Sequence, residues 1–132
     1  SKTKTGALMI YPKTSILQHI ANTGTIIDGA IFSKFIESIF NKNSPLHDGA
    51  VIIADKKITA ANCISPVSDN PDISPRVGLR HRAAVGITEI SDSLAIVVSE
   101  ERGKIAYALG AKLNLNTSIE KIKKLLSEFI GS

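Results

Sequence analysis

Residues 49–64 read GAVIIADKKITAANCI, two runs of apolar and β-branched residues on either side of the polar triplet Asp55-Lys56-Lys57. Short apolar runs separated by a turn are typical of two strands joined in a hairpin. We therefore predict strands over residues 49–54 and 58–64, and a β-sheet as the main element of the fold.

Other segments extend this sheet and cover it. Short apolar runs that end at turn residues predict further strands over residues 5–11, 94–98 and 105–109. Apolar residues at helical spacing predict helices over residues 16–23 and 80–90 and, behind Asp28 as a candidate N-cap, over residues 31–40. Residues 117–120, Thr-Ser-Ile-Glu, form a capping box before a last amphipathic helix.

The order of these elements indicates the fold class. Strands and helices alternate early, strands dominate later, and one helix closes the chain. This order predicts an α/β fold with a mixed central β-sheet flanked by helices. The length of 132 residues suits one hydrophobic core, so we expect residues 1–132 to form a single domain.

Composition excludes several classes of protein. A hydrophobic fraction of 43% with 21% charged residues is that of a globular protein, not of a disordered chain. Cys63 is the only cysteine, which excludes an intrachain disulfide and suits a reducing cytoplasm. The longest apolar runs, such as residues 7–11, are far shorter than the roughly 20 residues that span a bilayer. The net charge of +4 is compatible with a phosphate-bearing partner.

The first motif with chemical potential is His47-Asp48-Gly49-Ala50, where a loop enters a predicted strand. Imidazole and carboxylate are adjacent there, and the glycine allows a ligand to approach the backbone closely. An ordinary Asp-Gly turn is the alternative interpretation. The similar tripeptide that begins at Asp28 is interpreted as a helix cap.

The second motif is Arg80-His81-Arg82 at the start of a predicted helix. Cations oppose the helix dipole at this end, whereas free N–H groups and guanidinium forks together suit a phosphate. The alternative is a salt bridge from these arginines to Glu89 or Asp92.

The third motif, Ser99-Glu100-Glu101, ends a predicted strand, a place where ligands commonly bind in sheets covered by helices. A polar turn before Gly103 is the alternative. Taken together, the three motifs supply oxygen ligands for a divalent cation and positive charge for a polyphosphate, the groups that metal-assisted phosphoryl transfer uses.

The motifs PLHDGA (residues 45–50), RHRAAVGI (residues 80–87) and VVSEE (residues 97–101), in this order and spacing, closely resemble the diadenylate cyclase domain over residues 5–130. The resemblance implies an enzyme that joins two ATP molecules into the second messenger cyclic di-AMP and releases two pyrophosphates. It also implies a divalent metal and a symmetric, face-to-face homodimer in which each subunit binds one ATP. The two nucleotides then react with each other across the interface.

The resemblance also implies roles for single residues. It assigns catalysis to Asp48, Arg80, His81 and Arg82. It assigns ATP binding to Gly49, Ala50, Ile64, Leu79, Arg80, Ser99 and Glu100, and metal binding to His47, Asp48 and Glu100. An imidazole ligand favours Mn²⁺ or Co²⁺ over Mg²⁺. Leu79 departs from the Thr that many members carry before the Arg-His-Arg motif, and we expect it to pack against adenine beside Ile64.

Part of the family carries this domain behind transmembrane helices. Because the chain begins with Ser1 rather than Met, we expect a cytoplasmic domain excised from a membrane-anchored protein, with any regulatory proteins bound to the longer chain. A nucleotide-binding sensor without cyclase activity is the alternative function. A nucleic-acid-binding domain is disfavoured because the aromatic residues fall mostly at predicted core positions: Tyr11, Phe32, Phe35, Phe40, Tyr107 and Phe129.

Overall fold

The structure is a computed structural model that describes residues 7–13, 17–23, 25–30, 49–54, 57–75, 77–98 and 104–131. Its strands are β1 (Ala7–Tyr11), β2 (Thr25–Ala30), β3 (Ala50–Ala54), β4 (Lys57–Cys63), β5 (Leu94–Val98), β6 (Ile105–Leu109) and β7 (Lys112–Thr117). Its helices are α1 (Gln18–Ala21), α3 (Leu79–Glu89) and α4 (Ile119–Gly131).

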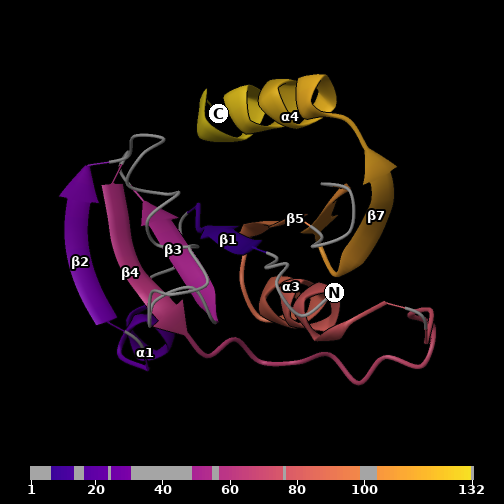
Figure 1. Cartoon of the computed structure of the whole chain (residues 1–132), viewed down its shortest axis with the longest axis horizontal. Helices are drawn as coiled ribbons and strands as arrows, with labels where there is room; N and C mark the ends of the chain where they lie inside the picture. The colour runs from indigo at the N-terminus through magenta and orange to yellow at the C-terminus, as the bar shows by residue number, and fades with distance from the viewer. Residues whose placement is uncertain are drawn as a thin grey trace.

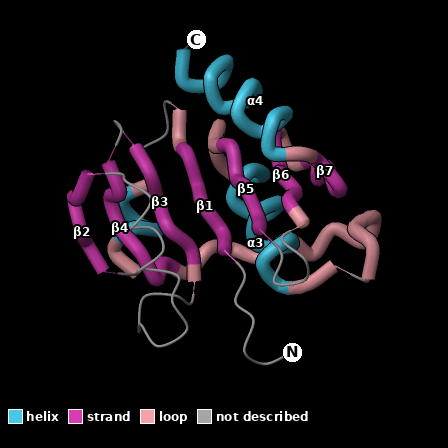
Figure 2. Tube along the Cα trace, turned by 45° about the horizontal axis from the view of Figure 1, so that its top comes forward, coloured by secondary structure: helices cyan, strands magenta, loops and turns pink. Residues whose placement is uncertain are grey.

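The strands form one sheet in the order β2-β4-β3-β1-β5-β6-β7, which Figure 2 shows from one edge to the other. β1 lies in the middle and pairs in parallel with β3 and antiparallel with β5. The pairs β2–β4, β3–β4, β5–β6 and β6–β7 are antiparallel. The predicted mixed sheet is therefore confirmed, including the hairpin of β3 and β4 that residues 49–64 indicate.

Helices cover both faces of the sheet, with α1 and α3 on one side and α4 on the other (Figure 1). Alternate residues of the central strands point to opposite faces, as the pleat of a strand requires. In β1, Leu8 and Ile10 join the core beneath α1 and α3, whereas Met9 and Tyr11 pack on the α4 side. The predicted α/β fold with flanking helices is thus confirmed.

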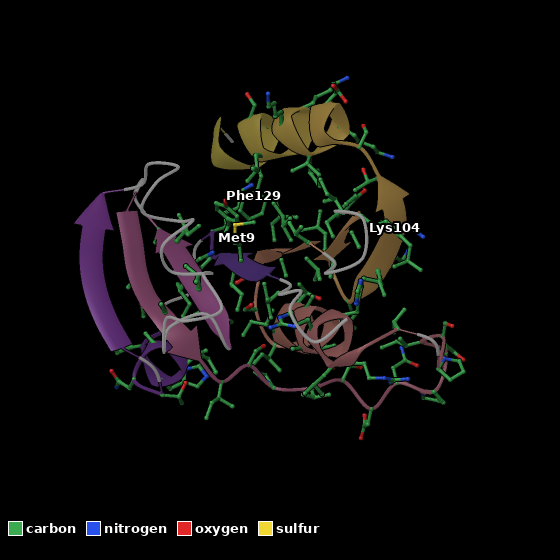
Figure 3. All side chains as sticks on the ribbon, in the orientation of Figure 1. Met9, Lys104 and Phe129 are labelled. Carbon is green, nitrogen blue, oxygen red and sulfur yellow. The ribbon has the colours of Figure 1, made fainter. Side chains whose placement is uncertain are left out.

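The face of α4 toward the sheet carries Ile122, Leu125, Leu126 and Phe129, at the helical spacing that the sequence shows. Figure 3 shows Met9 of β1 pointing toward Phe129, and the Lys13 ammonium lies 5.2 Å from the centre of the same ring. Tyr11 and Tyr107 belong to this core as well, which confirms the core position expected for them. These rings are consequently not a platform for stacked bases.

Asp28 is not a helix cap, because it lies within β2. β2 pairs antiparallel with β4, from Thr25 opposite Ala61 to Ala30 opposite Lys57, so its backbone takes part in the sheet instead of starting a helix. The β-branched residues at positions 25–27 are the sequence signal for this strand. The helix expected over residues 31–40 lies outside the described residues.

The predicted capping box does not form: the cap of α4 lies one residue later than expected, which puts Lys121 rather than Glu120 at the third helical position. Thr117 ends β7, a strand that the sequence did not lead us to expect, and Ser118 caps α4 because its hydroxyl accepts a hydrogen bond from the Lys121 N–H at 3.1 Å. β7 forms because the tight turn at Gly110 and Ala111 folds the chain back onto β6. Helix α3 begins at Leu79, one residue before its predicted start.

Candidate functional site

The ends of four neighbouring strands lie side by side and form one edge of the sheet, at right angles to the edge strands β2 and β7. Because β1 is parallel to β3 and antiparallel to β5, the starts of β1 and β3 lie beside the end of β5, where Ala7 pairs with Val98. The pairing of Ala50 with Cys63 brings the end of β4 to the same edge. Gly49 and Ala50 of the first motif therefore lie at the same edge of the sheet as Val98, the last residue of β5.

The start of β3 has the backbone form that the Asp-Gly motif predicts. Gly49 has a φ of 80°, a left-handed conformation that side-chain-bearing residues rarely adopt. Ala50 follows at once in the strand and is buried, with 1% of its surface exposed. A substitution at Gly49 would consequently strain the entry into β3.

The segment after β4 joins this edge to α3. Figure 1 shows the chain leaving β4, running past α3 and then returning into it. The Ser65 hydroxyl donates a hydrogen bond to the Ala83 carbonyl at 3.0 Å, and the Ser68 N–H donates one to the Arg82 carbonyl at 2.9 Å. These contacts hold the first turn of α3 against the chain that leaves β4.

The first turn of α3 has the features of an anion site. Gly78 is the N-cap and provides no side-chain hydrogen bond, and this turn carries no acidic residue. The Arg80 Nε is buried and has no hydrogen-bond partner within the described ranges. Uncapped N–H groups and guanidinium donors both favour a phosphate at this position.

The alternative interpretation of the arginines is a salt bridge to Glu89, but the structure shows a hydrogen bond from another residue to this carboxylate. Ser68 donates its hydroxyl hydrogen to Glu89 Oε2 at 2.8 Å, at the last turn of α3, ten residues along the sequence from residue 79. Glu89 is thus engaged in holding the loop to the helix.

Burial sets the protonation of two groups near this edge. Partial burial of His81 lowers the pKa of its imidazole below the usual 6.5, which favours the neutral ring. Burial of Cys63 raises the pKa of its thiol to about 11, so the thiolate is scarce at neutral pH. Cys63 therefore acts as a small apolar residue of the core.

Two large apolar side chains close to this edge face solvent. Ile64, directly after β4, and Leu79, the first residue of α3, are each 70% exposed. A ligand that covered these two side chains would gain free energy by burying their apolar surface. Their exposure agrees with the contact to a base that the sequence predicts for both.

The structure accordingly describes one part of the predicted site. It describes Gly49, Ala50, Ile64, Leu79, Arg80, His81 and Arg82. The pairing of Ala50 with Cys63 and the hydrogen bond from Ser65 to Ala83 link the segments that carry them. His47, Asp48, Ser99 and Glu100 lie outside the described residues. Within the described ranges, no group of three or more His, Cys, Asp or Glu side chains could hold a metal ion.

Sequence reasoning missed the hydroxyl groups that organise this edge. Thr23, Ser65 and Ser68 all bind the backbone of the segment after β4 or of α3. Ser65 and Ser68 are buried beside exposed apolar neighbours, a reversal of the usual pattern that a sequence cannot show.

Comparisons with known proteins agree with this geometry. The family model described as "DisA bacterial checkpoint controller nucleotide-binding" (DAC) matches residues 1–113. The chain is 40% identical to the cyclic di-AMP synthase CdaA of Bacillus subtilis and 41% identical to a diadenylate cyclase of Listeria monocytogenes. Each match covers 96% of this chain and 46% of the relative, so the chain spans about half the length of these proteins.

Solved structures show the same fold. A double mutant of DacA from Staphylococcus aureus superposes with a TM-score of 0.94 at 43% identity, covering 99% of this chain and 87% of that one. A protein from Bacillus cereus, described as a hypothetical membrane spanning protein, gives a TM-score of 0.80 at 38% identity, covering 86% of this chain and 55% of that one. Among the described residues, no helix is long and apolar enough to cross a bilayer. By sequence and by fold, the chain belongs to the diadenylate cyclase domain family.

Proposed function

We propose that this chain is a diadenylate cyclase, a nucleotidyltransferase that condenses two ATP molecules into cyclic di-AMP. The observation that carries the proposal is the first turn of α3, which has no side-chain cap and whose buried Arg80 Nε has no hydrogen-bond partner among the described residues. The Ser65–Ala83 hydrogen bond joins this helix to the chain that follows Ile64, and Ile64 and Leu79 are both exposed. A base can cover the apolar side chains while the phosphates meet the cationic turn. The family membership supports the same activity.

The reaction needs positioning and charge neutralisation more than covalent catalysis. The 3′-hydroxyl oxygen of one ATP forms a bond to the α-phosphorus of the other, and the bond from that phosphorus to the pyrophosphate oxygen breaks. The hydroxyl proton passes to the Asp48 carboxylate or to water. Arg80 and Arg82 bind the phosphate oxygens, and a second transfer in the opposite sense closes the ring and releases the second pyrophosphate.

The proposal includes a divalent metal ion, because three side chains of the motifs are suitable metal ligands. His47, Asp48 and Glu100 offer one imidazole and two carboxylates, a set that suits Mn²⁺ or Co²⁺ better than Mg²⁺. When bound, the metal would neutralise the charge of the triphosphate. Activity that is equal or higher with Mg²⁺ alone would argue against His47 as a ligand.

Two copies of the chain are required, because each 3′-hydroxyl must reach the α-phosphate bound by the other subunit. We propose a symmetric homodimer in which the edges with the two sites face each other. The activity per subunit should then rise with protein concentration until the dimer is fully formed. Activity that is independent of concentration, from a chain that sediments as a monomer, would exclude this arrangement.

The similarity to a protein described as membrane spanning supports a further proposal, that the protein is held at the membrane with this domain in the cytoplasm. Fractionation of cells that express the natural protein would place it in the membrane pellet. Recovery from the soluble fraction would contradict the proposal.

The decisive experiment incubates the concentrated chain with ATP and Mn²⁺ and detects cyclic di-AMP by mass spectrometry. Asp48→Asn is expected to abolish the product, and Asp72→Asn, a change to an exposed carboxylate of the loop, serves as the matched control. ATP binding without product would favour the sensor function. Absence of ATP binding would refute both functions.

A further inference from the structure

In residues 64–68 two apolar side chains are exposed and two hydroxyl groups are buried, the reverse of the usual arrangement. Ile64 and Val67 are 70% and 48% exposed, whereas Ser65 and Ser68 retain only 8% and 3% of their surface. Loops usually bury apolar side chains and expose hydroxyl groups. Hydrophobic burial therefore does not fix the position of Ile64, and hydrogen bonds to the backbone must do so.

One of these hydrogen bonds acts on Ile64 itself. The Ile64 N–H donates to Thr23 Oγ1 at 2.7 Å, a contact between residues 41 positions apart in sequence. The Thr23 hydroxyl in turn donates to the Ile20 carbonyl of α1 at 2.6 Å. Because the second bond fixes the rotation of the hydroxyl, a lone pair of Thr23 Oγ1 stays directed at the Ile64 N–H.

We propose that Thr23 is a positioning residue for nucleotide binding, which holds Ile64 where its side chain covers the adenine base. The proposal rests on the proposed function, because it assigns Thr23 to the same site. Thr23 acts through Ile64 and needs no contact with the nucleotide. Loss of its hydroxyl should therefore weaken ATP binding and leave the chemical step unchanged.

Thr88 provides a matched control. Its hydroxyl donates to the Val85 carbonyl, three residues back, at 2.8 Å and accepts a hydrogen bond from the Ala111 N–H at 3.1 Å. This is the arrangement of Thr23, but it lies at the other end of α3, beside the β6–β7 turn. Thr88→Val and Thr23→Val thus remove the same kinds of hydrogen bond, from a buried hydroxyl at residue 88 and from an exposed residue at position 23.

The test measures KM and kcat for cyclic di-AMP formation, and ATP affinity by calorimetry, in the chain and its variants. Thr23→Val should raise KM about three- to tenfold with kcat within about twofold, as expected for the loss of one hydrogen bond that acts on binding. Thr23→Ser, which keeps the hydroxyl, should restore KM, and Thr88→Val should leave it unchanged. If Thr23→Val does not fold, Thr23→Ala provides the same comparison.

A double-mutant cycle tests whether Thr23 acts through Ile64. Ile64→Ala should raise KM by itself, and adding Thr23→Val should then have little further effect. Additive effects, an unchanged KM in Thr23→Val, or equal effects of Thr23→Val and Thr88→Val would each overturn the role of Thr23 while the cyclase function stands. A wild-type chain that binds no ATP would instead refute the proposed function, and the role of Thr23 with it.

Discussion

Gly86 of α3 lies in contact with the backbone of Pro66 in the segment after β4. A Cβ atom at Gly86 would overlap the Pro66 carbonyl oxygen and would lie 2.7 Å from its carbonyl carbon and 3.0 Å from the Ser68 nitrogen. Only a residue without a side chain permits this approach. Along the loop, Pro66 lies between Ser65 and Ser68, which both form hydrogen bonds to backbone carbonyl groups of α3.

Gly86→Ala should therefore destabilise the protein by about 2–3 kcal/mol, because neither the helix nor the loop backbone can yield without loss of these hydrogen bonds. Urea unfolding measures the change. Gly78→Ala is the control, since a Cβ there meets nothing within 4 Å; it should cost less than about 1 kcal/mol. Equal stability of Gly86→Ala and wild type would mean that the loop is not packed against α3.

The turn between β6 and β7 contains a strained residue. Ala111 has a φ of 67°, next to Gly110 with a φ of 57°. The left-handed form costs alanine about 1 kcal/mol, of which the greater freedom of glycine in the unfolded chain offsets roughly half. Ala111→Gly should thus raise the free energy of unfolding by about 0.5 kcal/mol, and Gly110→Ala should lower it. A loss of stability in Ala111→Gly would contradict this interpretation.

The helix cap that the structure assigns to α4 can be tested against the one that the sequence suggests. Ser118→Ala removes the acceptor of the Lys121 N–H and should cost about 1 kcal/mol. The Thr117 hydroxyl is buried without a hydrogen-bond partner among the described residues, so Thr117→Val should leave stability unchanged or increase it. Thermal unfolding of both variants decides the question; a larger loss in Thr117→Val would restore Thr117 as the cap.

Stability should depend on pH through His81. Its pKa in the folded chain is below 6.5, so the unfolded chain binds the proton more readily. The free energy of unfolding therefore falls as the pH drops from about 6.5 toward the lowered pKa, and His81 makes no such contribution above 6.5. His81→Gln should lose less stability than wild type between pH 7.5 and about 5.5. Parallel pH profiles for both proteins would exclude the effect.

The Cys63 thiol should be unreactive in the folded protein. It is 1% exposed, its Sγ lies 3.7 Å from the Ala61 carbonyl oxygen, and burial raises its pKa to about 11. Labelling with a thiol reagent at neutral pH should be slow, and fast in denaturant. Val67→Cys in a Cys63→Ala background should react quickly, since position 67 is 48% exposed. Fast labelling of native Cys63 would contradict its burial.

Much of the fold follows from local sequence patterns. The runs that form β3 and β5 are apolar throughout, as strands buried on both faces require. β7 was missed although Leu113 and Leu115 alternate with Lys112 and Asn114, because asparagine is uncommon in strands. Its pairing with β6 depends on the preceding turn, a context that a propensity argument does not include.

The candidate site also has some features that local sequence patterns predict and others that they do not. Chain-local signals such as Asp-Gly before a strand, or arginine at a helix start, could be found in the sequence, and the structure describes Gly49 and the first turn of α3 as expected. The hydrogen bond from Ile64 to Thr23 could not be found, because it joins residues 41 positions apart. Only the neighbouring positions of β2 and β4 in the sheet make it possible.

The central place of β1 determines how the sheet can assemble. Met9 pairs with Val51 of β3 on one side and with Ile96 of β5 on the other, so both contacts close long loops. The β3–β4 hairpin and the β5–β6–β7 meander close much shorter ones, whose entropy cost is lower. We expect the two halves to form separately and the first strand of the chain to insert between them as the slow step of folding.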